Sequence, residues 1–425
     1  MPPGGTRRVN RAWSLPRNYE EMVARRKALQ AWSAVSCGFL GRSPDHLASA
    51  LIGQRVGMDV WMKYDEKRAK AFADYVDHAA RNDFFLTYVI INPQADRSKD
   101  WGDQVDELVA AIVDEDSAGV TIRGAKMLGT SAIMANEIFI ANLQPLKPGE
   151  EKLAFSCALP MATKGMKVLS RKSYEQHAVS VYDNPLSSRF DENDALVYFD
   201  NVKVPWERVF VHDDPELSRN IYIRTPAHFM SNHQSNVRFW AKLRLLIGLA
   251  SKIAKSNGAH AIPAVRETLG RLAAMEACYA GMIEGQHQGH ERMETGHVHV
   301  NRRYMYAAVN YALENHAPIC DMIRTLMGGG AFQMPADSSV LQDAELSKIF
   351  ENYWSTLDHS AEDRLKLFKL AWDLLGSEFA MRHDQYEKFY VGPSFVVRNY
   401  NFMNAPWEEL EGLVDGVIAE SAERK

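Results

Sequence analysis

The hydrophobic periodicity of this chain changes twice, and these two changes constrain its fold more than any other sequence feature. Within residues 19–82 apolar side chains such as Met22 and Leu29 recur at helical spacing, which predicts helices. Within residues 84–211 short β-rich runs alternate with polar turns, which predicts a compact antiparallel barrel or sandwich. From about Pro215 long amphipathic segments return, and these should pack together as a bundle.

These changes divide the 425 residues into three predicted domains. They are an N-terminal helical domain over residues 1–83, a central β domain over 84–211 and a C-terminal helical bundle over 212–425. We therefore predict an α+β protein. Since 46% of the residues are hydrophobic, the chain can bury a large core.

Charge and cysteine usage exclude several classes of protein. The formal net charge of −5 gives no overall attraction to nucleic acid or to an acidic membrane. The four cysteines lie far apart without a C-x-x-C pair, which indicates buried thiols in a reducing compartment. The N-terminus lacks the apolar stretch of a secretory signal, and the longest apolar run, residues 84–91, is too short to span a bilayer. We expect a cytoplasmic protein.

Two segments carry polar side chains that a hydrophobic core does not need. The loop at residues 92–98, Asn-Pro-Gln-Ala-Asp-Arg-Ser, follows an apolar strand-like run and presents an amide, a carboxylate and a guanidinium. Asn232-His233-Gln234 opens a long amphipathic helix that continues through Arg238 and Lys242. A solvated turn and a surface basic stripe are the ordinary interpretations of these patterns, and contact with a polar ligand such as a flavin is the other.

Several motifs in a fixed order make one family resemblance specific. The run Phe199–Trp206 resembles the strand exit of the acyl-CoA dehydrogenase fold. The ordered set as a whole resembles the 4-hydroxyphenylacetate 3-hydroxylase family, the oxygenase components of two-component, FADH2-dependent phenol monooxygenases, over about residues 10–400. The motifs are Leu40–Asp45 (LGRSPD), Asn92–Ser98 (NPQADRS), Gly124–Thr130 (GAKMLGT), Asn232–Gln234 (NHQ), Met327–Gly330 (MGGG) and Gly376–Arg382 (GSEFAMR).

The resemblance implies a fold and an activity. The fold would be acyl-CoA dehydrogenase-like, with N-terminal helices, a central antiparallel β-barrel or sandwich and a C-terminal bundle. The activity would be ortho-hydroxylation of a phenol through a C4a-hydroperoxyflavin, with O2 as co-substrate and FADH2 supplied by a separate NAD(P)H:flavin reductase. The family also implies a homotetramer or a homodimer.

The resemblance assigns the phenol to three residues. Arg42 would approach the phenol hydroxyl, where a fixed cation lowers the phenol pKa and favours attack at the ortho carbon. His46 stands where these enzymes usually have a tyrosine, and Tyr88 stands where they have a histidine. The exchange keeps a polar pair, so the pocket remains suited to a hydroxylated ring.

The resemblance also assigns a flavin site. His233 would face the flavin and hydrogen-bond its oxygenated adduct, which makes it a catalytic residue together with Arg42. The glycine-rich turn and the Gly376–Arg382 segment would complete the site, with help from a neighbouring subunit. The predicted cofactor-binding residues are Gln94, Asp96, Arg97, Thr130, His233, Gln234, Arg238, Gly328, Gly329, Gly330, Ser377 and Phe379.

Other interpretations were weighed against this one. His287, His290, His297 and His299 invite a metal site, but glycines interrupt the helix between them, and we predict no metal. A 4-hydroxybutyryl-CoA dehydratase-like enzyme would need cysteines for an iron–sulfur cluster near the site, and the sequence lacks them there. An acyl-CoA dehydrogenase-like enzyme that oxidises a thioester and a non-catalytic flavin or aromatic binder remain the alternatives. The residues leave open which phenol is used and whether it is free or carrier-bound.

Overall fold

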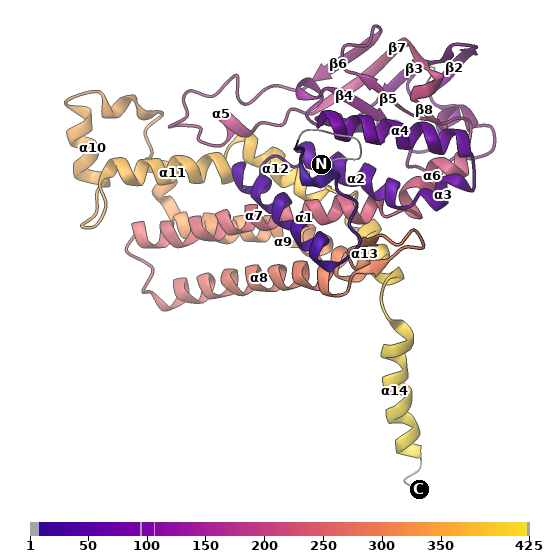
Figure 1. The fold of residues 1–425 in the computed structure, drawn as a ribbon. Helices are drawn as coiled ribbons and strands as arrows, with labels where there is room; N and C mark the ends of the chain where they lie inside the picture. The colour runs from indigo at the N-terminus through magenta and orange to yellow at the C-terminus, as the bar shows by residue number, and fades with distance from the viewer. Residues whose placement is uncertain (1–7, 94–95, 106, 423–425) are drawn as a thin grey trace.

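The computed structural model describes residues 8–93, 96–105 and 107–422 (Figure 1). The three predicted regimes appear in the predicted order: helices, a β region and a helical bundle. The N-terminal helices are α1 (Tyr19–Val35), α2 (Pro44–Val56), α3 (Met58–Met62) and α4 (Glu66–Asn82), preceded by the 3₁₀ turn η1 (Arg11–Trp13).

The β region holds two four-stranded sheets. One has the order β1-β4-β5-β8 and the other β2-β3-β7-β6. The strands are β1 (Leu86–Val89), β2 (Ala111–Asp116), β3 (Gly119–Lys126), β4 (Glu137–Ile140), β5 (Ser156–Pro160), β6 (Met166–Ser170), β7 (Ala195–Pro205) and β8 (Val209–Val211). Short helical turns connect them: η2 (Trp101–Asp103), η3 (Ala132–Met134), η4 (Glu151–Leu153), α5 (Ser187–Phe190) and η5 (Trp206–Arg208).

The sandwich prediction is confirmed and the barrel alternative is wrong. Buried side chains from both sheets, such as Ile138 and Leu159 from one and Ile122 and Phe199 from the other, form a single cluster between them. Neither sheet of the described chain closes on itself. The sheet β1-β4-β5-β8 is also not purely antiparallel, because β1 and β4 run parallel.

The C-terminal region is a bundle built around one long helix, α7, which packs against α2, α8 and α9. The helix α14 at the C-terminus projects away from the rest of the molecule (Figure 1). The elements are α6 (Pro215–Ile223), α7 (Ala227–Ser256), α8 (Pro263–Gln288), β9 (Glu291–Arg292), β10 (Val298–His299), α9 (Arg302–Met327), η6 (Gly328–Gln333), η7 (Ser338–Leu341), α10 (Leu346–Trp354), α11 (Ala361–Leu375), α12 (Glu378–Lys388), α13 (Ser394–Met403) and α14 (Trp407–Ala422).

The N-terminal helices and the bundle share a hydrophobic core, even though the β region separates them in sequence. Leu47 and Leu51 of α2 belong to the same buried cluster as Val237 and Leu243 of α7. Gly53 allows this packing, since a Cβ there would collide with the backbone of α7 at its first residue. The domain boundaries at residues 83/84 and 211/212 stay a prediction. Among the described residues no helix is both long and apolar enough to cross a membrane.

Candidate active site

The site begins at the N-terminus of α2, where Arg42 lies just before the helix. Ser43 is the N-cap and Pro44 takes the first helical position, where its missing N–H is no loss. The Arg42 backbone N–H donates to Glu192 Oε2 at 2.7 Å, and its Nη2 donates to the carbonyl oxygen of Tyr390 at 3.1 Å. These contacts fix the guanidinium group at the junction of α2, the loop before β7 and the end of α12.

Three tyrosines surround the Arg42 guanidinium. Its central carbon lies 4.0 Å from the ring centre of Tyr390, 5.6 Å from that of Tyr386 and 5.7 Å from that of Tyr88. Gly41 makes room for this arrangement, because a Cβ there would collide with the Tyr386 hydroxyl. Cations over aromatic faces are stabilised by the ring quadrupole, so the cage holds a charge inside the protein.

The Arg42 cation is permanent but incompletely hydrogen-bonded. Burial opposes its charge, yet the tyrosines around it and the Glu192 carboxylate raise the Arg42 pKa above its ordinary value. Among the described residues, neither Arg42 Nη1 nor the Tyr386 hydroxyl has a hydrogen-bond partner. Buried polar atoms are normally paired, so these two leave capacity to bind an oxygen atom of a ligand.

His46 lies one turn further along α2, in the same pocket. Its Nε2 is 3.4 Å from the Tyr88 hydroxyl, the two rings are stacked 5.7 Å apart, and its Nδ1 is 3.0 Å from Gln234 Oε1. Burial, together with the Arg42 charge, lowers the His46 pKa well below its ordinary value, so the ring is neutral. The structure thus brings together Arg42, His46 and Tyr88, the three residues predicted for the substrate, with Gln234 beside them.

Two features of this pocket were missed by sequence reasoning. Tyr386 and Tyr390 come from α12 and the residue stretch after it, more than 340 positions beyond Arg42. Their spacing of four residues on a helix indicates a shared face, which was the only signal available. Glu192, which holds the Arg42 backbone, is fully buried and accepts a hydrogen bond from Arg382 Nη1 at 2.8 Å.

His233 does not face this pocket. Its Nδ1 is 2.8 Å from Gln286 Oε1 and its Nε2 is 3.2 Å from His287 Nε2, both on α8. The ring is buried, and burial lowers its pKa well below the ordinary value. The flavin contact predicted for His233 stays a prediction, and this geometry weighs against it.

Arg238 and Lys242 share a helix face, as their spacing predicts, but that face is not solvated. Both side chains bind the Glu387 carboxylate, and all three are at most 1% exposed. Burial lowers the Lys242 pKa to about 8, although Glu387 opposes the shift. The surface-stripe interpretation is therefore wrong. Glu387 already occupies both Nη atoms of Arg238, the residue that was predicted to bind the cofactor.

Thr130 lies on the loop after β3, beside an apolar surface. Its carbonyl oxygen accepts from Thr87 Oγ1 at 2.7 Å, and its Oγ1 donates to Asp194 at 3.0 Å. Leu128 of the same loop is 53% exposed, and Ile133 of the adjoining turn η3 is 61% exposed. Such a combination of fixed polar groups and bare apolar side chains suits a flat, partly polar ring such as isoalloxazine.

The loop after β1 is anchored at its base and exposed at its tip. Asn92 accepts a hydrogen bond from the buried Lys126 amine at 2.6 Å. Asp96 accepts from the backbone N–H of Ser98 at 3.0 Å, and Asp96 and Arg97 are both exposed. Gln94, the remaining predicted residue of this loop, lies outside the described residues.

The Gly376–Arg382 segment forms the start of α12. Ser377 caps this helix by accepting from the Ala380 N–H at 3.1 Å, and Phe379 is buried against Phe39. These two predicted cofactor residues have structural contacts, whereas Arg382 was not singled out. Its guanidinium makes two bonds to Asp194, the partner of Thr130, and so ties α12 to the Thr130 loop.

The glycine-rich turn Gly328–Gly330 begins η6, directly after α9. Gly328 has a φ of +56°, which non-glycine residues adopt rarely, and a Cβ at Gly330 would press on the Phe368 ring. Within the described chain these glycines thus allow the backbone to turn sharply at the end of α9.

Of the histidines considered for a metal, His287 contacts His233. The group in the described residues with metal-ligand spacing is instead His316, Cys320 and Asp384, which lies inside the bundle.

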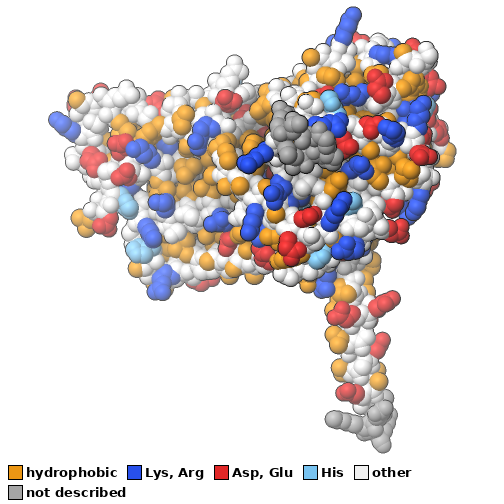
Figure 2. Space-filling view, viewed as in Figure 1, with side chains coloured by type: hydrophobic (Ala, Val, Ile, Leu, Met, Phe, Trp, Pro, Cys, Tyr) orange, Lys and Arg blue, Asp and Glu red, His pale blue; other side chains and the backbone are white. Residues whose placement is uncertain are grey.

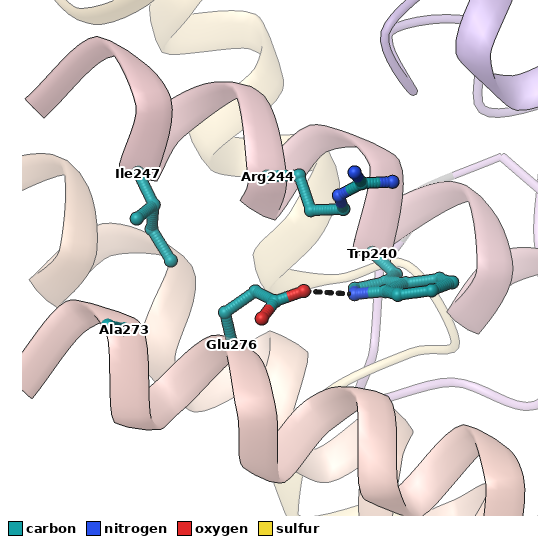
Figure 3. A pocket seen from close by; sticks show the side chains of 5 residues that line it. All are labelled: Trp240, Arg244, Ile247, Ala273 and Glu276. Atoms are coloured by element: carbon teal, nitrogen blue, oxygen red, sulfur yellow. Dashed lines mark hydrogen bonds between the residues drawn. The ribbon is translucent and has the colours of Figure 1, made fainter. Parts of the chain in front are cut away.

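A separate hollow of about 440 Å³ lies between α7 and α8, lined by Trp240, Arg244, Ile247, Ala273 and Glu276 (Figure 3). Inside it the Trp240 indole donates to Glu276 at 2.6 Å. None of the predicted site residues lines it. We place the site at the cluster around Arg42, because a cation and buried polar atoms without partners among the described residues lie together there.

Comparison with known proteins agrees with the sequence-based resemblance. Residues 2–211 match the model of the 4-hydroxyphenylacetate 3-hydroxylase N-terminal family and residues 218–419 that of its C-terminal family. The pyoverdin chromophore biosynthetic protein PvcC of Pseudomonas aeruginosa is 32% identical over 92% of this chain and 78% of its own length. The oxygenase component of 4-nitrophenol 2-monooxygenase from a Rhodococcus species is 30% identical over 90% of this chain and 73% of its own.

A solved structure shows the same fold. The oxygenase component of 4-hydroxyphenylacetate 3-monooxygenase, complexed with FAD and 4-hydroxyphenylacetate, superposes with a TM-score of 0.90. It is 26% identical, and the match covers 97% of this chain and 85% of that one. The acyl-CoA dehydrogenase-like fold predicted from the strand exit at Phe199–Trp206 is thereby confirmed.

Proposed function

The chain belongs to the 4-hydroxyphenylacetate 3-hydroxylase family, and from this membership we propose that it hydroxylates a phenol at the carbon ortho to its hydroxyl group. It is a flavin-dependent monooxygenase with FAD as its cofactor and O2 as its co-substrate. We propose further that a separate NAD(P)H:flavin reductase supplies the flavin in its reduced form. Family membership favours this activity over the thioester oxidation considered as the alternative.

One observation carries the proposal for the substrate. Arg42 is a half-buried cation whose Nη1 atom is buried and has no partner among the described residues, and its guanidinium lies beside aromatic rings and the neutral imidazole of His46. A phenol matches this environment, since its ring packs among aromatic side chains while its oxygen accepts from the cation. The nearby cation also lowers the pKa of the phenol.

The residues on and next to the loop that carries Thr130 are chemically suited to contact a flavin. The exposed Leu128, Ile133 and Met134 side chains would cover the ring, and the Asp194–Arg382 pair holds the loop in place. Asp96 and Arg97 would meet polar parts of the cofactor from the loop after β1. When bound in its reduced form, the flavin supplies one oxygen atom of O2 through its C4a-hydroperoxide.

The protein then contributes orientation and exclusion of water. Arg42 holds the phenol oxygen, and the rings of Tyr88 and Tyr390 fix the plane in which the substrate lies. A phenol held by its oxygen presents its ortho carbon at one defined position. The proposed product is a catechol.

The test is a screen of phenols with chemically reduced FAD under air, in which mass spectrometry detects products that have gained one oxygen atom. Chemical reduction removes the need for a reductase, so a positive result establishes the oxygenase activity alone. A second series with NADH and a flavin reductase then tests the supply of FADH2. If no phenol is hydroxylated while bound FADH2 is oxidised, the proposed activity is wrong.

We also propose that the chain assembles with copies of itself, as a homotetramer or a homodimer. Helix α14 carries an exposed apolar stripe, Leu410, Leu413, Val414, Val417 and Ile418, at positions that share one helix face. Acidic residues lie among the other positions of this projecting helix (Figure 2): Glu408, Glu409, Glu411, Asp415 and Glu420. An apolar stripe of this length indicates a surface that another subunit covers.

A further inference from the structure

Four buried side chains, Ser43, Asp45, His46 and Gln234, link the start of α2 to α7. Gln234 Nε2 lies 3.1 Å from Asp45 Oδ1, and Gln234 Oε1 lies 3.0 Å from His46 Nδ1. Ser43 completes the group, since its hydroxyl donates to Asp45 Oδ1 at 2.5 Å and accepts from Gln234 Nε2 at 3.2 Å. Asp45 and Gln234 are fully buried and His46 is 4% exposed, so water competes little for these bonds.

With Asp45 ionised, the donor and acceptor chemistry of this group permits one arrangement of protons. The Tyr390 hydroxyl, 3.5 Å from His46 Nδ1, donates to the Gly41 carbonyl oxygen and can therefore accept from Nδ1. An ionised carboxylate accepts hydrogen bonds, so Asp45 requires the NH2 end of the Gln234 amide. The Ser43 hydroxyl has given its one proton to Asp45, so it also requires that end. The carbonyl end of Gln234 therefore faces His46, and Nδ1 of the neutral ring must carry the proton. His46 Nε2 then carries a lone pair. Its partner among the described residues is the Tyr88 hydroxyl 3.4 Å away, which the substrate hydroxyl would replace.

We propose that Asp45, acting through the Gln234 amide, sets the tautomer of His46 so that Nε2 accepts the hydroxyl proton of the substrate. The inference rests on the proposed phenol hydroxylation and adds the direction of proton transfer. In this proposal Asp45 and Gln234 are positioning residues, which act on the substrate only through the tautomer of His46. His46 is the group that touches the substrate.

The surroundings of His46 Nε2 support this assignment. The Tyr88 hydroxyl is 3.4 Å away, and the Arg42 cation lies over the same tyrosine ring. A phenol oxygen bound by Arg42 would receive hydrogen bonds from Nη1 and would find its own acceptor in Nε2. The charged groups that act on the His46 ring are Arg42 and Arg238. Both favour its neutral form, so an imidazolium formed there returns its proton readily.

The proton movement balances over the reaction. As the ortho carbon forms its bond to oxygen, the O–H bond of the phenol breaks and its proton moves to Nε2, which gives an imidazolium and a ring ketone. When the ring regains aromaticity, the imidazolium returns this proton to the ketone oxygen. The proton lost from the ortho carbon leaves in the water molecule that carries the second oxygen atom of O2. FADH2 is oxidised to FAD.

The exchange of residues at positions 46 and 88 explains why this chain needs to fix one tautomer of His46. A tyrosine hydroxyl, which the family usually has at position 46, can donate or accept by rotating. An imidazole cannot, because each nitrogen is either a donor or an acceptor. Burial raises the Asp45 pKa to about 6, so the carboxylate form that holds the amide is present at neutral pH.

The test compares wild type with Asp45→Asn and Gln234→Met. An asparagine can donate or accept at position 45, so the Gln234 amide can turn over and offer its NH2 group to His46 Nδ1. Bound 4-nitrophenol reports the result without flavin or turnover, because its phenolate absorbs at longer wavelength than its phenol. Near neutral pH we expect both variants to bind at least about twofold more phenolate than the wild type does, because a protonated Nε2 donates to the phenolate oxygen.

Turnover provides an independent measurement. Loss of a positioned proton acceptor should lower kcat by roughly tenfold or more, while KM should change little because Arg42 still holds the oxygen. The double variant should behave as either single variant does, since both changes break one chain of contacts. Asp77→Asn on α4 is the matched control, and it should leave both measurements unchanged.

The outcomes separate the two proposals. If 4-nitrophenol binds with the same protonation state in wild type and in both variants, the proposal that Asp45 sets the His46 tautomer is wrong, but the proposed phenol-binding site is retained. If neither 4-nitrophenol nor any other phenol binds to the wild type, the proposed function fails and this inference fails with it. If either Asp45→Asn or Gln234→Met does not fold, the other variant alone tests whether the protonation state of bound 4-nitrophenol changes.

Discussion

His233 and Gln286 face each other across the contact between α7 and α8, with Nδ1 2.8 Å from Oε1. The other ring nitrogen of His233 lies 3.2 Å from His287 Nε2. Both nitrogens of this imidazole therefore have protein partners. Contact with a flavin would require the ring to leave at least one of them.

We expect His233→Ala to destabilise the protein without uncoupling the reaction. Loss of the ring leaves the buried Gln286 carbonyl unpaired, which should lower the free energy of unfolding by about 2 kcal/mol. The yield of H2O2 per FADH2 oxidised should stay near the wild-type value. Urea unfolding measures the free energy, and stopped-flow absorbance with a peroxide assay measures the peroxide yield. A higher peroxide yield would support the flavin contact predicted from the sequence.

Arg42→Ala should weaken phenol binding and spare the oxidation of FADH2. A hydrogen bond to a charged group contributes about 1.5–3 kcal/mol, so the Kd for the phenol should rise roughly 10- to 100-fold. Titration with 4-nitrophenol measures this directly. Arg123→Ala removes an arginine on the surface of β3 and should have no effect. Unchanged affinity and product yield in Arg42→Ala would remove this residue from the site.

The residues at positions 46 and 88 should depend on each other. His46→Tyr and Tyr88→His each place two like groups in a pocket that holds one imidazole and one phenol hydroxyl, 3.4 Å apart. Each single change should lower kcat/KM by roughly tenfold or more, and the double change should recover part of the loss. Recovery with 4-hydroxyphenylacetate in particular would show that the exchange determines substrate preference. Additive losses would argue against a shared function.

The sequence predicted the α2 side of the site better than the α7 side, for a physical reason. Arg42 and His46 are four positions apart around the start of one helix, so their proximity follows from local geometry. His233 and Gln234 are adjacent on a helix and point about 100° apart, so the chain alone does not show which of them faces the pocket. Here Gln234 does.

Partners distant in sequence account for the other differences. The pairing of Arg238 with Lys242 was visible, but their burial depends on Glu387, which is 149 and 145 residues further along. The sequence predicted an antiparallel barrel or sandwich without naming strand pairs, because alternating burial gives no strand direction, whereas β1 and β4 run parallel. The chain between β1 and β4 forms the β2–β3 hairpin in the other sheet, and this excursion returns β4 parallel to β1.

Charge placed in the apolar stripe of α14 should weaken self-assembly. We expect the combined change Leu413→Glu and Val417→Glu to lower the molar mass in solution by at least half, because two buried charges would oppose the contact. Size-exclusion chromatography with light scattering gives this mass. Glu411→Gln changes the acidic part of the same helix and should leave the mass unchanged. An unaltered mass in the doubly substituted protein would exclude α14 from the interface.

The last prediction concerns a buried histidine in the bundle. His316 Nδ1 lies 3.0 Å from Asp384 Oδ1, and its Nε2 is 3.8 Å from Cys320 Sγ. Burial alone would lower the His316 pKa, but the Cys320 sulfur and the Asp384 carboxylate raise it to about 9. The folded chain therefore keeps a proton on this ring over a pH range in which the unfolded chain has lost it.

The sign of the pH dependence follows from this difference. The stabilisation by His316 is fully present below the unfolded pKa of about 6.5 and is lost as the pH rises through about 9. Each pKa unit corresponds to about 1.4 kcal/mol, so the loss should be on the order of 3 kcal/mol. His316→Gln should remove this slope, as measured by urea unfolding at several pH values across the range.

Comparing His316→Gln with wild type separates the effect of His316 on the pH dependence of stability from the effects of other titratable groups. Burial lowers the Lys126 pKa to about 7, so Lys126 gives stability the opposite slope at alkaline pH, and it does so equally in both proteins. His177→Gln, at an exposed position, serves as the control and should keep the wild-type slope. If the His316→Gln protein loses stability between neutral and alkaline pH as steeply as the wild type does, the imidazolium is not what Asp384 holds in the folded state.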